Sequence, residues 1–192
     1  MAWEFFHEVG RKVIHITILI VLAVYFFIEK SMSKQVALFF LVGLLMAFLI
    51  LEYLRLELEW KMPFFSQFIR PKEEHRMYGV IYFLSAAVIV LAVFDKKIAL
   101  AALLMTTFGD MMAALIGKKY GTTLIYRNKT WAGFLAEMGT NLIVGFFILD
   151  NIYVIIGMAA VATFVETLVD DMDDNLLIPL FSGFIGQLIL WI

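Results

Sequence analysis

The acidic run "DDMDD" at residues 170–174 places four aspartates within five positions, between two strongly apolar stretches. Carboxylates this close together repel one another, and a bound cation is what makes such a cluster favourable. Oxygen ligands in this number suit Mg²⁺, or Ca²⁺. Asp110 and Glu166 lie inside apolar stretches, where an ionised, unpaired carboxylate costs several kcal/mol. We therefore predict that Asp173 and Asp174 hold Mg²⁺ together with Asp110 or Glu166.

The segment "GKKYGTTLIYRNKT" at 117–130 combines glycines, hydroxyl side chains and four basic residues. Such a set suits phosphate binding, because Lys and Arg form charge-assisted hydrogen bonds to phosphate oxygens. It is not a Walker A loop, since the spacing of its glycines and lysines differs. A divalent cation beside basic residues is typical of phosphoryl transfer and indicates a nucleotide or a phosphorylated lipid. The residues that we predict to contact phosphate here are Lys118, Arg127, Lys129 and Thr130.

The composition indicates that these residues belong to a membrane protein. The chain has 192 residues and no Cys, and it is 63% hydrophobic, whereas a soluble domain is nearer half apolar. Strand-like alternation is absent, so helices are the natural way to pair the backbone in lipid. We predict one all-α membrane domain over 1–192 with seven transmembrane helices, at 13–28, 36–54, 79–94, 98–116, 131–149, 152–168 and 176–192.

The basic residues predict the orientation of this bundle. Eleven of the 15 Lys and Arg fall before 13–28 or in the links 55–78 and 117–130, and four fall on the other side. The positive-inside rule then places the N-terminus in the cytoplasm and the C-terminus outside. The acidic run 170–174 is placed on the cytoplasmic side as well. The link 55–78 mixes charges with aromatic residues, which favours an interfacial amphipathic segment.

Polar and small residues follow helical spacing and predict which faces of the spans point inward. Gly109, Ala113 and Gly117 would let another helix or a ligand approach closely. Two polar stripes are expected to face the bundle interior or a wet cavity. They are Thr130, Gly133, Glu137 and Asn141 in one span, and Thr163, Glu166, Thr167 and Asp170 in the next. Near the end of 36–54, the spacing of Glu52 and Arg55 predicts a local ion pair.

Four segments together resemble the family of CTP-dependent lipid kinases, which includes dolichol kinase, phytol kinase and the yeast-type diacylglycerol kinase. They are "EVGRKVIH" at 8–15, "FGDMMAALIGKKYG" at 108–121, "NKTWAGF" at 128–134 and "VETLVDDMDDNLLIPL" at 165–180. The resemblance implies transfer of the CTP γ-phosphate to a lipid hydroxyl. It assigns to the site Asp110, Lys129, Glu166, Asp173, Asp174 and Asn175. It also implies that Arg11, Lys12 and His15 form a conserved N-terminal element, which we include with Asn175 in the nucleotide-binding set.

The predicted function is thus a Mg²⁺- and CTP-dependent kinase that phosphorylates a lipid alcohol of the polyprenol, phytol-like or diacylglycerol-like kind, with its active site facing the cytoplasm. Asp110, Lys129 and Asp174 are the predicted catalytic residues, and Asp110 positions or deprotonates the lipid hydroxyl. Two alternatives stay open. "KTWAG" at 129–133 is similar to membrane cytidylyltransferases, which also use CTP. A cation transporter is the other, although no paired broken helices or inverted repeat are evident.

Overall fold

The computed structural model describes residues 18–57, 77–169 and 172–192. The chain divides into two compact units, 1–88 and 89–192, with the boundary inside helix α3 (Gly79–Val93). Each unit is described by itself. That 1–192 forms a single domain remains a prediction.

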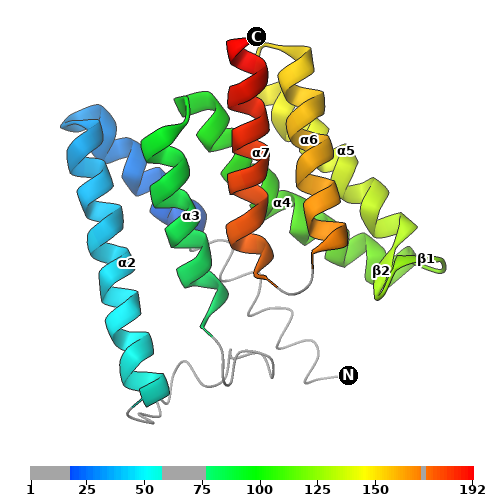
Figure 1. The fold of residues 1–192 in the computed structure, drawn as a ribbon, viewed down its shortest axis with the longest axis horizontal. Coiled ribbons are helices and arrows are strands. Elements are labelled where there is room, and N and C mark those ends of the chain that lie inside the picture. The colour runs from blue at the N-terminus through cyan, green and yellow to red at the C-terminus, as the bar shows by residue number, and fades with distance from the viewer. Residues whose placement is uncertain (1–17, 58–76, 170–171) are drawn as a thin grey trace. The chain divides into compact units, whose positions relative to one another are not determined.

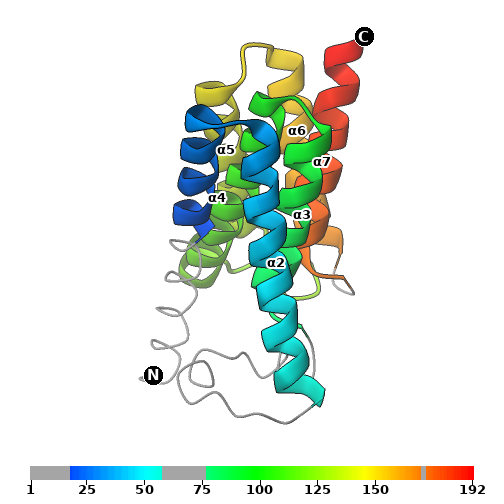
Figure 2. The same cartoon turned by 90° about the vertical axis from the view of Figure 1, so that its left-hand side faces the viewer.

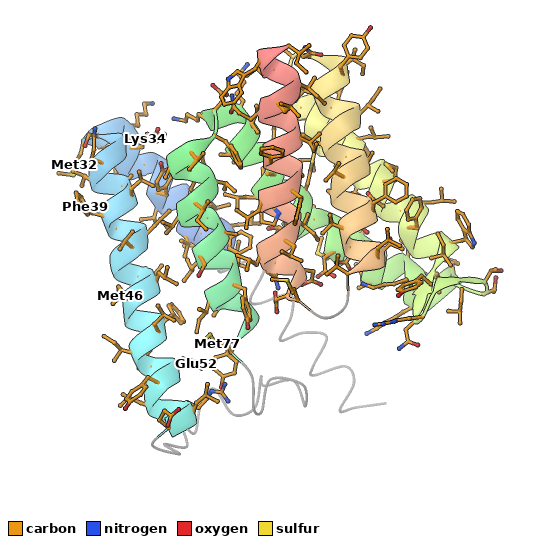
Figure 3. The ribbon with its side chains drawn as sticks, viewed as in Figure 1. Met32, Lys34, Phe39, Met46, Glu52 and Met77 are labelled. Carbon is orange, nitrogen blue, oxygen red and sulfur yellow. The ribbon has the colours of Figure 1, made fainter. Side chains whose placement is uncertain are left out.

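The first unit contains a helix at 18–31, α2 (Lys34–Glu57) and the beginning of α3. The predicted ion pair of Glu52 and Arg55 is confirmed, because Arg55 donates to both carboxylate oxygens of Glu52, at 2.9 and 2.6 Å. Glu52 also accepts the backbone N–H of Tyr78 at 3.1 Å. The buried carboxylate therefore joins the end of α2 to the chain entering α3, where Figure 3 shows Glu52 beside Met77.

Apolar side chains cover the outer face of this unit as well as its interior. Figure 3 labels Met32 beside the start of α2, and Phe39 and Met46 along α2, and all three are largely exposed. Tyr25 and Leu41 are almost completely buried. Helices that are apolar on their exposed faces are suited to lipid rather than water.

The second unit contains four helices and a short hairpin. They are α4 (Lys96–Tyr120), β1 (Leu124–Tyr126), β2 (Lys129–Thr130), α5 (Trp131–Ile148), α6 (Ile152–Leu168) and α7 (Asp174–Trp191). The four helices lie side by side in both Figure 1 and Figure 2. A polar side chain accepts a backbone N–H at the start of each helix, which satisfies a donor that has no partner within the helix. These caps are Asp95, Thr130, Asn151 and Asp173.

An apolar core joins α4, α6 and α7. Met105 and Ile98 of α4 pack with Met158 of α6 and Ile178 of α7, and all four side chains are at least 98% buried. The residue after Ile178 is Pro179, which lies inside α7. Pro has no N–H, so the helical bond to the carbonyl of Asn175 cannot form.

The six predicted spans from 36–54 onward agree closely with α2 to α7, which begin and end within four residues of the expected positions. The first predicted span, 13–28, begins outside the described residues. By length and composition, α2, α4, α5 and α7 can cross a membrane, while α3 and α6 are shorter apolar helices of 15 and 17 residues. These helices favour a membrane protein. A bundle of seven spans and a cytoplasmic N-terminus remain predictions, and the interfacial segment predicted in 55–78 lies mostly outside the described residues.

The structure corrects the interpretation of 117–130 as a loop. Helix α4 continues to Tyr120 and ends at Gly121, whose N–H donates to the carbonyl of Gly117 at 2.9 Å. Lys118 and Lys119 occupy its last turn, where cations interact favourably with the helix dipole. The antiparallel hairpin of β1 and β2 follows. Helix α7 likewise begins earlier than the predicted span 176–192, because its first residue is Asp174 of the acidic run.

Candidate active site

Three carboxylates from three helices meet in the second unit. Asp110 of α4, Glu166 of α6 and Asp174 of α7 each place one oxygen so that all three oxygens lie within 4.8 Å of one another. Figure 1 shows why these distant segments meet, since the end of α6, the start of α7 and the hairpin lie at the same end of the helices. The structure thus brings together three of the four residues that the sequence predicts as metal ligands.

Lys129 on β2 is a basic residue that contacts the cluster directly. Its Nζ forms an ion pair and hydrogen bond with Oε1 of Glu166, a side chain that is only 3% exposed. Burial acts to lower the pKa of Lys129, but the charge and hydrogen bond of Glu166, with the charges of Asp174 and Asp110, outweigh it. The net effect raises the pKa of Lys129, so the ammonium form is held firmly beside the acids.

The hairpin fixes the position of Lys129. Tyr126 pairs with Lys129 and Leu124 with Thr130, and the N–H of Trp131 donates to the carbonyl of Thr123 at 3.1 Å. The hydroxyl of Thr130 then accepts the N–H of Gly133 at 3.2 Å and caps α5. Lys129 is consequently anchored on both sides, by strand pairing and by the start of a helix.

Small residues bring α4 and α5 close together beside the cluster. A Cβ atom on Gly133 would lie 3.0 Å from the carbonyl oxygen of Ala113, and one on Gly117 would lie 3.1 Å from the hydroxyl of Thr130. A Cβ on Gly109 would lie 2.5 Å from Oδ1 of Asn141. The close helix approach predicted for Gly109, Ala113 and Gly117 is confirmed, and it sets the separation between Asp110 and Lys129.

A second layer of polar side chains lies deeper between the helices. Glu137 and Asn141 of α5 and Thr163 of α6 are at least 98% buried, and Nδ2 of Asn141 donates to the hydroxyl of Thr163 at 3.1 Å. Glu137 interacts electrostatically with Glu166, Asp110 and Lys129. The sequence predicts that Glu137 lies in an inward-facing stripe, but Glu137 is not among the predicted site residues. Its position seven residues after Thr130 on the same helical face was the available signal.

The two aspartates at the start of α7 differ in their contacts. Oδ1 of Asp173 accepts two hydrogen bonds from Asn175, one from the backbone N–H at 3.1 Å and one from Nδ2 at 2.9 Å. This side chain therefore caps the helix. Oδ1 of Asp174, the first residue of α7, also accepts the N–H of Asn175, at 2.9 Å, but of the two aspartates it is Asp174 that reaches the cluster with Asp110. Metal binding by Asp173 and nucleotide binding by Asn175 remain predictions.

The remaining predicted residues are placed as follows. Lys118 is exposed in the last turn of α4, and Arg127 is exposed at the hairpin turn, with its guanidinium 5.4 Å from the ring centre of Tyr126. Thr130 caps α5 as described above. The other predicted residues, together with two aspartates of the acidic run, lie outside the described residues; they are Arg11, Lys12, His15, Asp170 and Asp171.

The cluster fits a divalent cation. Its ligand atoms are carboxylate oxygens, the type that Mg²⁺ and Ca²⁺ prefer. Oε2 of Glu166 is buried and has no hydrogen-bond partner among the described residues, although a buried polar atom normally has one. The described fold is thus a set of apolar helices, four of them long enough to cross a membrane, with a three-carboxylate cluster that could hold a cation.

Comparison with known proteins identifies its relatives. The chain is 33% identical over 148 residues to CTP-dependent diacylglycerol kinase 1 of Saccharomyces cerevisiae, covering 71% of the chain and 49% of that protein. It is 34% identical over 137 residues to the protein of the same name from Eremothecium gossypii, covering 68% and 42%. It is also 36% identical over 69 residues to that of Schizosaccharomyces pombe, covering 35% and 32%.

By its sequence, the chain is a relative of the CTP-dependent lipid kinases, and the resemblance drawn from its motifs is confirmed. The chain spans about half the length of the first two relatives. No protein-family model matches it. No solved structure matches it either.

Proposed function

We propose that the protein is a CTP-dependent lipid kinase that transfers the γ-phosphate of CTP to the hydroxyl of a membrane lipid. The observation that carries this proposal is the meeting of Asp110, Glu166 and Asp174 beside Lys129 at one end of the helices. Phosphoryl transfer asks little covalent chemistry of a protein and depends on positioning and on stabilising negative charge. A carboxylate cluster with an adjacent lysine, at the edge of an apolar bundle, can position the reactants and stabilise the negative charge.

In this proposal, the three carboxylates hold Mg²⁺, and the ion, when bound, neutralises phosphate charge. Lys129 donates to the phosphate oxygens of CTP, flanked by Lys118. Its ammonium is held in place by Glu166, so it is orientated before the nucleotide arrives. Asp110 orients the lipid hydroxyl and accepts its proton as the oxygen attacks the γ-phosphorus, and CDP leaves. The apolar exposed surfaces of the neighbouring helices keep the acceptor lipid within reach.

The acceptor that we propose first is a diacylglycerol-like alcohol, because the curated relatives are named as diacylglycerol kinases. Polyprenol and phytol-like alcohols remain alternatives within the same reaction. All three present a primary hydroxyl at the level of the lipid headgroups. We further propose that the site faces the cytoplasm, since the positive-inside rule predicts this side for the hairpin and for the start of α7.

The test is to incubate the purified full-length protein in phosphatidylcholine nanodiscs with magnesium, each candidate alcohol, and either γ-labelled or α-labelled CTP. We expect γ-label to appear in the diacylglycerol sample as a phosphorylated lipid, with release of CDP. ATP labelled at the γ-position serves as the donor control. The proposal fails if no alcohol acquires the γ-label from CTP while the protein remains folded.

A cytidylyltransferase is the second candidate, favoured by "KTWAG" at 129–133, where Ala132 precedes Gly133. The same experiment separates it from a kinase, because it would transfer the α-label to an acidic phospholipid and release pyrophosphate. A phosphatidate sample is therefore included. A cation transporter is disfavoured, because the described acids of the cluster meet at one end of the helices, where they form no path across them.

A further inference from the structure

The hairpin that carries Lys129 also presents an exposed mixed surface, of which only Arg127 belongs to the predicted phosphate-binding set. Among its apolar and aromatic residues, Tyr120 is 58%, Leu124 61% and Trp131 48% exposed. Lys119 lies 5.1 Å from the ring centre of Tyr120, and the guanidinium of Arg127 lies over the ring of Tyr126. We call Lys119, Tyr120, Leu124, Tyr126, Arg127 and Trp131 the hairpin surface.

The backbone at the hairpin turn points to a role for the Arg127 side chain. Arg127 has φ 44°, and it is the one non-glycine residue with positive φ in the described part of the chain. Glycine is the usual residue for such a position in a two-residue hairpin turn, because a Cβ atom is strained there. Strain of this kind is concentrated at functional sites. An arginine at this position suggests that its guanidinium serves a purpose that glycine would not.

The lengths of the adjoining helices place the hairpin surface at the level of the lipid headgroups. Helix α4 has 25 residues, which corresponds to about 37 Å at a rise of about 1.5 Å per residue. The hydrocarbon core of a bilayer is only about 30 Å thick. The hairpin leaves the end of α4 and leads directly into α5, a second helix that can cross a membrane. Both connections therefore hold it where the apolar core ends.

We propose that the hairpin surface binds anionic phospholipid headgroups, with Arg127 and Lys119 contacting the phosphates and the aromatic side chains anchored in the interfacial layer. Tyr and Trp are favoured at this depth because one part of each ring system is apolar and another is polar. Basic residues next to a membrane are attracted by anionic lipids. This binding needs neither CTP nor catalysis, so it can hold or fail independently of the proposed reaction.

The test measures lipid preference at the hairpin directly. In the full-length chain, we replace the other three tryptophans (Trp3→Phe, Trp60→Phe and Trp191→Phe), so that emission comes from Trp131. The protein is placed in phosphatidylcholine vesicles, and quenching by brominated phosphatidylserine is compared with quenching by brominated phosphatidylcholine. Arg127→Gly removes the guanidinium and relieves the backbone strain, so the chain should still fold. Lys119→Gln is the second variant, and Lys96→Gln at the opposite end of α4 is the matched control.

We expect stronger quenching by phosphatidylserine and a fall of about fivefold in this preference in Arg127→Gly, because one basic residue near an anionic surface contributes about 1 kcal/mol. Lys119→Gln should act in the same direction, and Lys96→Gln should change nothing. Magnesium–CTP binding should be the same in Lys119→Gln and in the parent, because Lys119 is not among the residues predicted to contact phosphate. An unchanged lipid preference in both hairpin variants overturns the proposal, and weakened CTP binding with unchanged preference assigns Arg127 to the nucleotide instead.

Discussion

At the scale of single residues, the site depends on how negative charge is kept inside an apolar bundle. Glu166 is almost completely buried, and an isolated carboxylate there would be strongly disfavoured. The ammonium group of Lys129 pairs with Oε1 of Glu166, whereas Oε2 has no hydrogen-bond partner among the described residues. Asp110 and Asp174 add two further acids within a few ångströms. The converging carboxylate oxygens, together with the buried Oε2 of Glu166 that has no partner among the described residues, are the physical reason for expecting a divalent ion.

Replacing Asp110 by Asn tests the residue proposed to contact both the cation and the lipid hydroxyl. The amide keeps the shape of the side chain but removes its charge and its ability to accept a proton. We expect turnover to fall by about 10²-fold or more, comparable to losing one group that stabilises the transition state. Labelled phosphate in the lipid product measures this. Asp150→Asn, a highly exposed aspartate paired with Lys97, is the control and should leave turnover unchanged. Near-normal activity in Asp110→Asn would refute the assignment.

The pair of Lys129 and Glu166 predicts how stability depends on pH. The folded protein raises the pKa of Lys129 above its ordinary value of 10.5. The stabilisation is therefore fully present below about that value, and it is lost as the pH rises through the folded pKa. We expect the difference in unfolding free energy between wild type and Lys129→Gln to shrink from about pH 10.5 upward. Unfolding in detergent over this range measures it, and a difference that grows with pH would contradict the pairing.

The sequence predicts the kinds of residue in the site better than their individual contacts. Asp110 and Glu166 are identifiable because acids are rare inside apolar stretches. Asp173 and Asp174 are adjacent and chemically identical, so their roles cannot be distinguished from the sequence. The residue at which α7 begins decides that Asp173 is the cap and that Asp174 reaches the cluster. Glu137 was identified as facing inward, but its proximity to the acids depends on how α5 packs against its neighbours.

At the scale of elements, the glycine contact between α4 and α5 sets the geometry of the site. Gly133 faces the backbone of α4 at Ala113, and the preceding turn of the chain carries Lys129. A side chain at Gly133 would meet a carbonyl oxygen of another helix, which cannot rotate away. The separation of the two helices, and with it the distance between Lys129 and Asp110, therefore depends on this contact.

Two glycines of α5 provide a matched comparison. Gly133→Ala should destabilise the protein by about 1–2 kcal/mol and reduce turnover, because overpacking outweighs the gain in helix propensity. Gly139→Ala, where a Cβ atom would meet nothing within 4 Å, should be neutral or stabilising by about 0.5–1 kcal/mol. Denaturation of both variants in the same detergent decides this. Equal effects of the two substitutions would show that the α4–α5 contact is not as close as described.

Most helices could be predicted because long apolar runs bounded by polar links leave few alternatives in a membrane. The hairpin could not, since three residues of β1 and two of β2 are too short to show alternation. Its signals are the β-favouring residues Ile125 and Tyr126, followed by a two-residue turn. The predicted span 98–116 ends too early, because the basic pair Lys118 and Lys119 is typical of a loop as well as of a last helical turn.

At the scale of the whole molecule, the account requires that the hairpin and the start of α7 open on one side of the membrane. Two further helices, α5 and α6, separate these segments in the chain, and an even number of crossings returns the chain to its starting side. The link between α5 and α6, at 149–151, must then face the opposite side.

The absence of Cys in the sequence makes this topology testable with single cysteines. Asn128→Cys at the hairpin and Met172→Cys before α7 should react with an impermeant thiol reagent only from the cytoplasmic side. Asn151→Cys should react only from the other side. Sealed vesicles of known orientation, with and without permeabilisation, supply the readout. If positions 128 and 172 react from opposite sides, no shared site can exist.

The most direct test of the central claim is the binding of Mn²⁺, as a substitute for Mg²⁺, to the purified full-length protein in nanodiscs, measured by electron paramagnetic resonance. We predict a binding site in the wild type that is lost in both Asp110→Asn and Asp174→Asn and is retained in Asp150→Asn. Binding as in the wild type when both cluster aspartates are replaced would contradict a divalent cation site at the meeting of α4, α6 and α7.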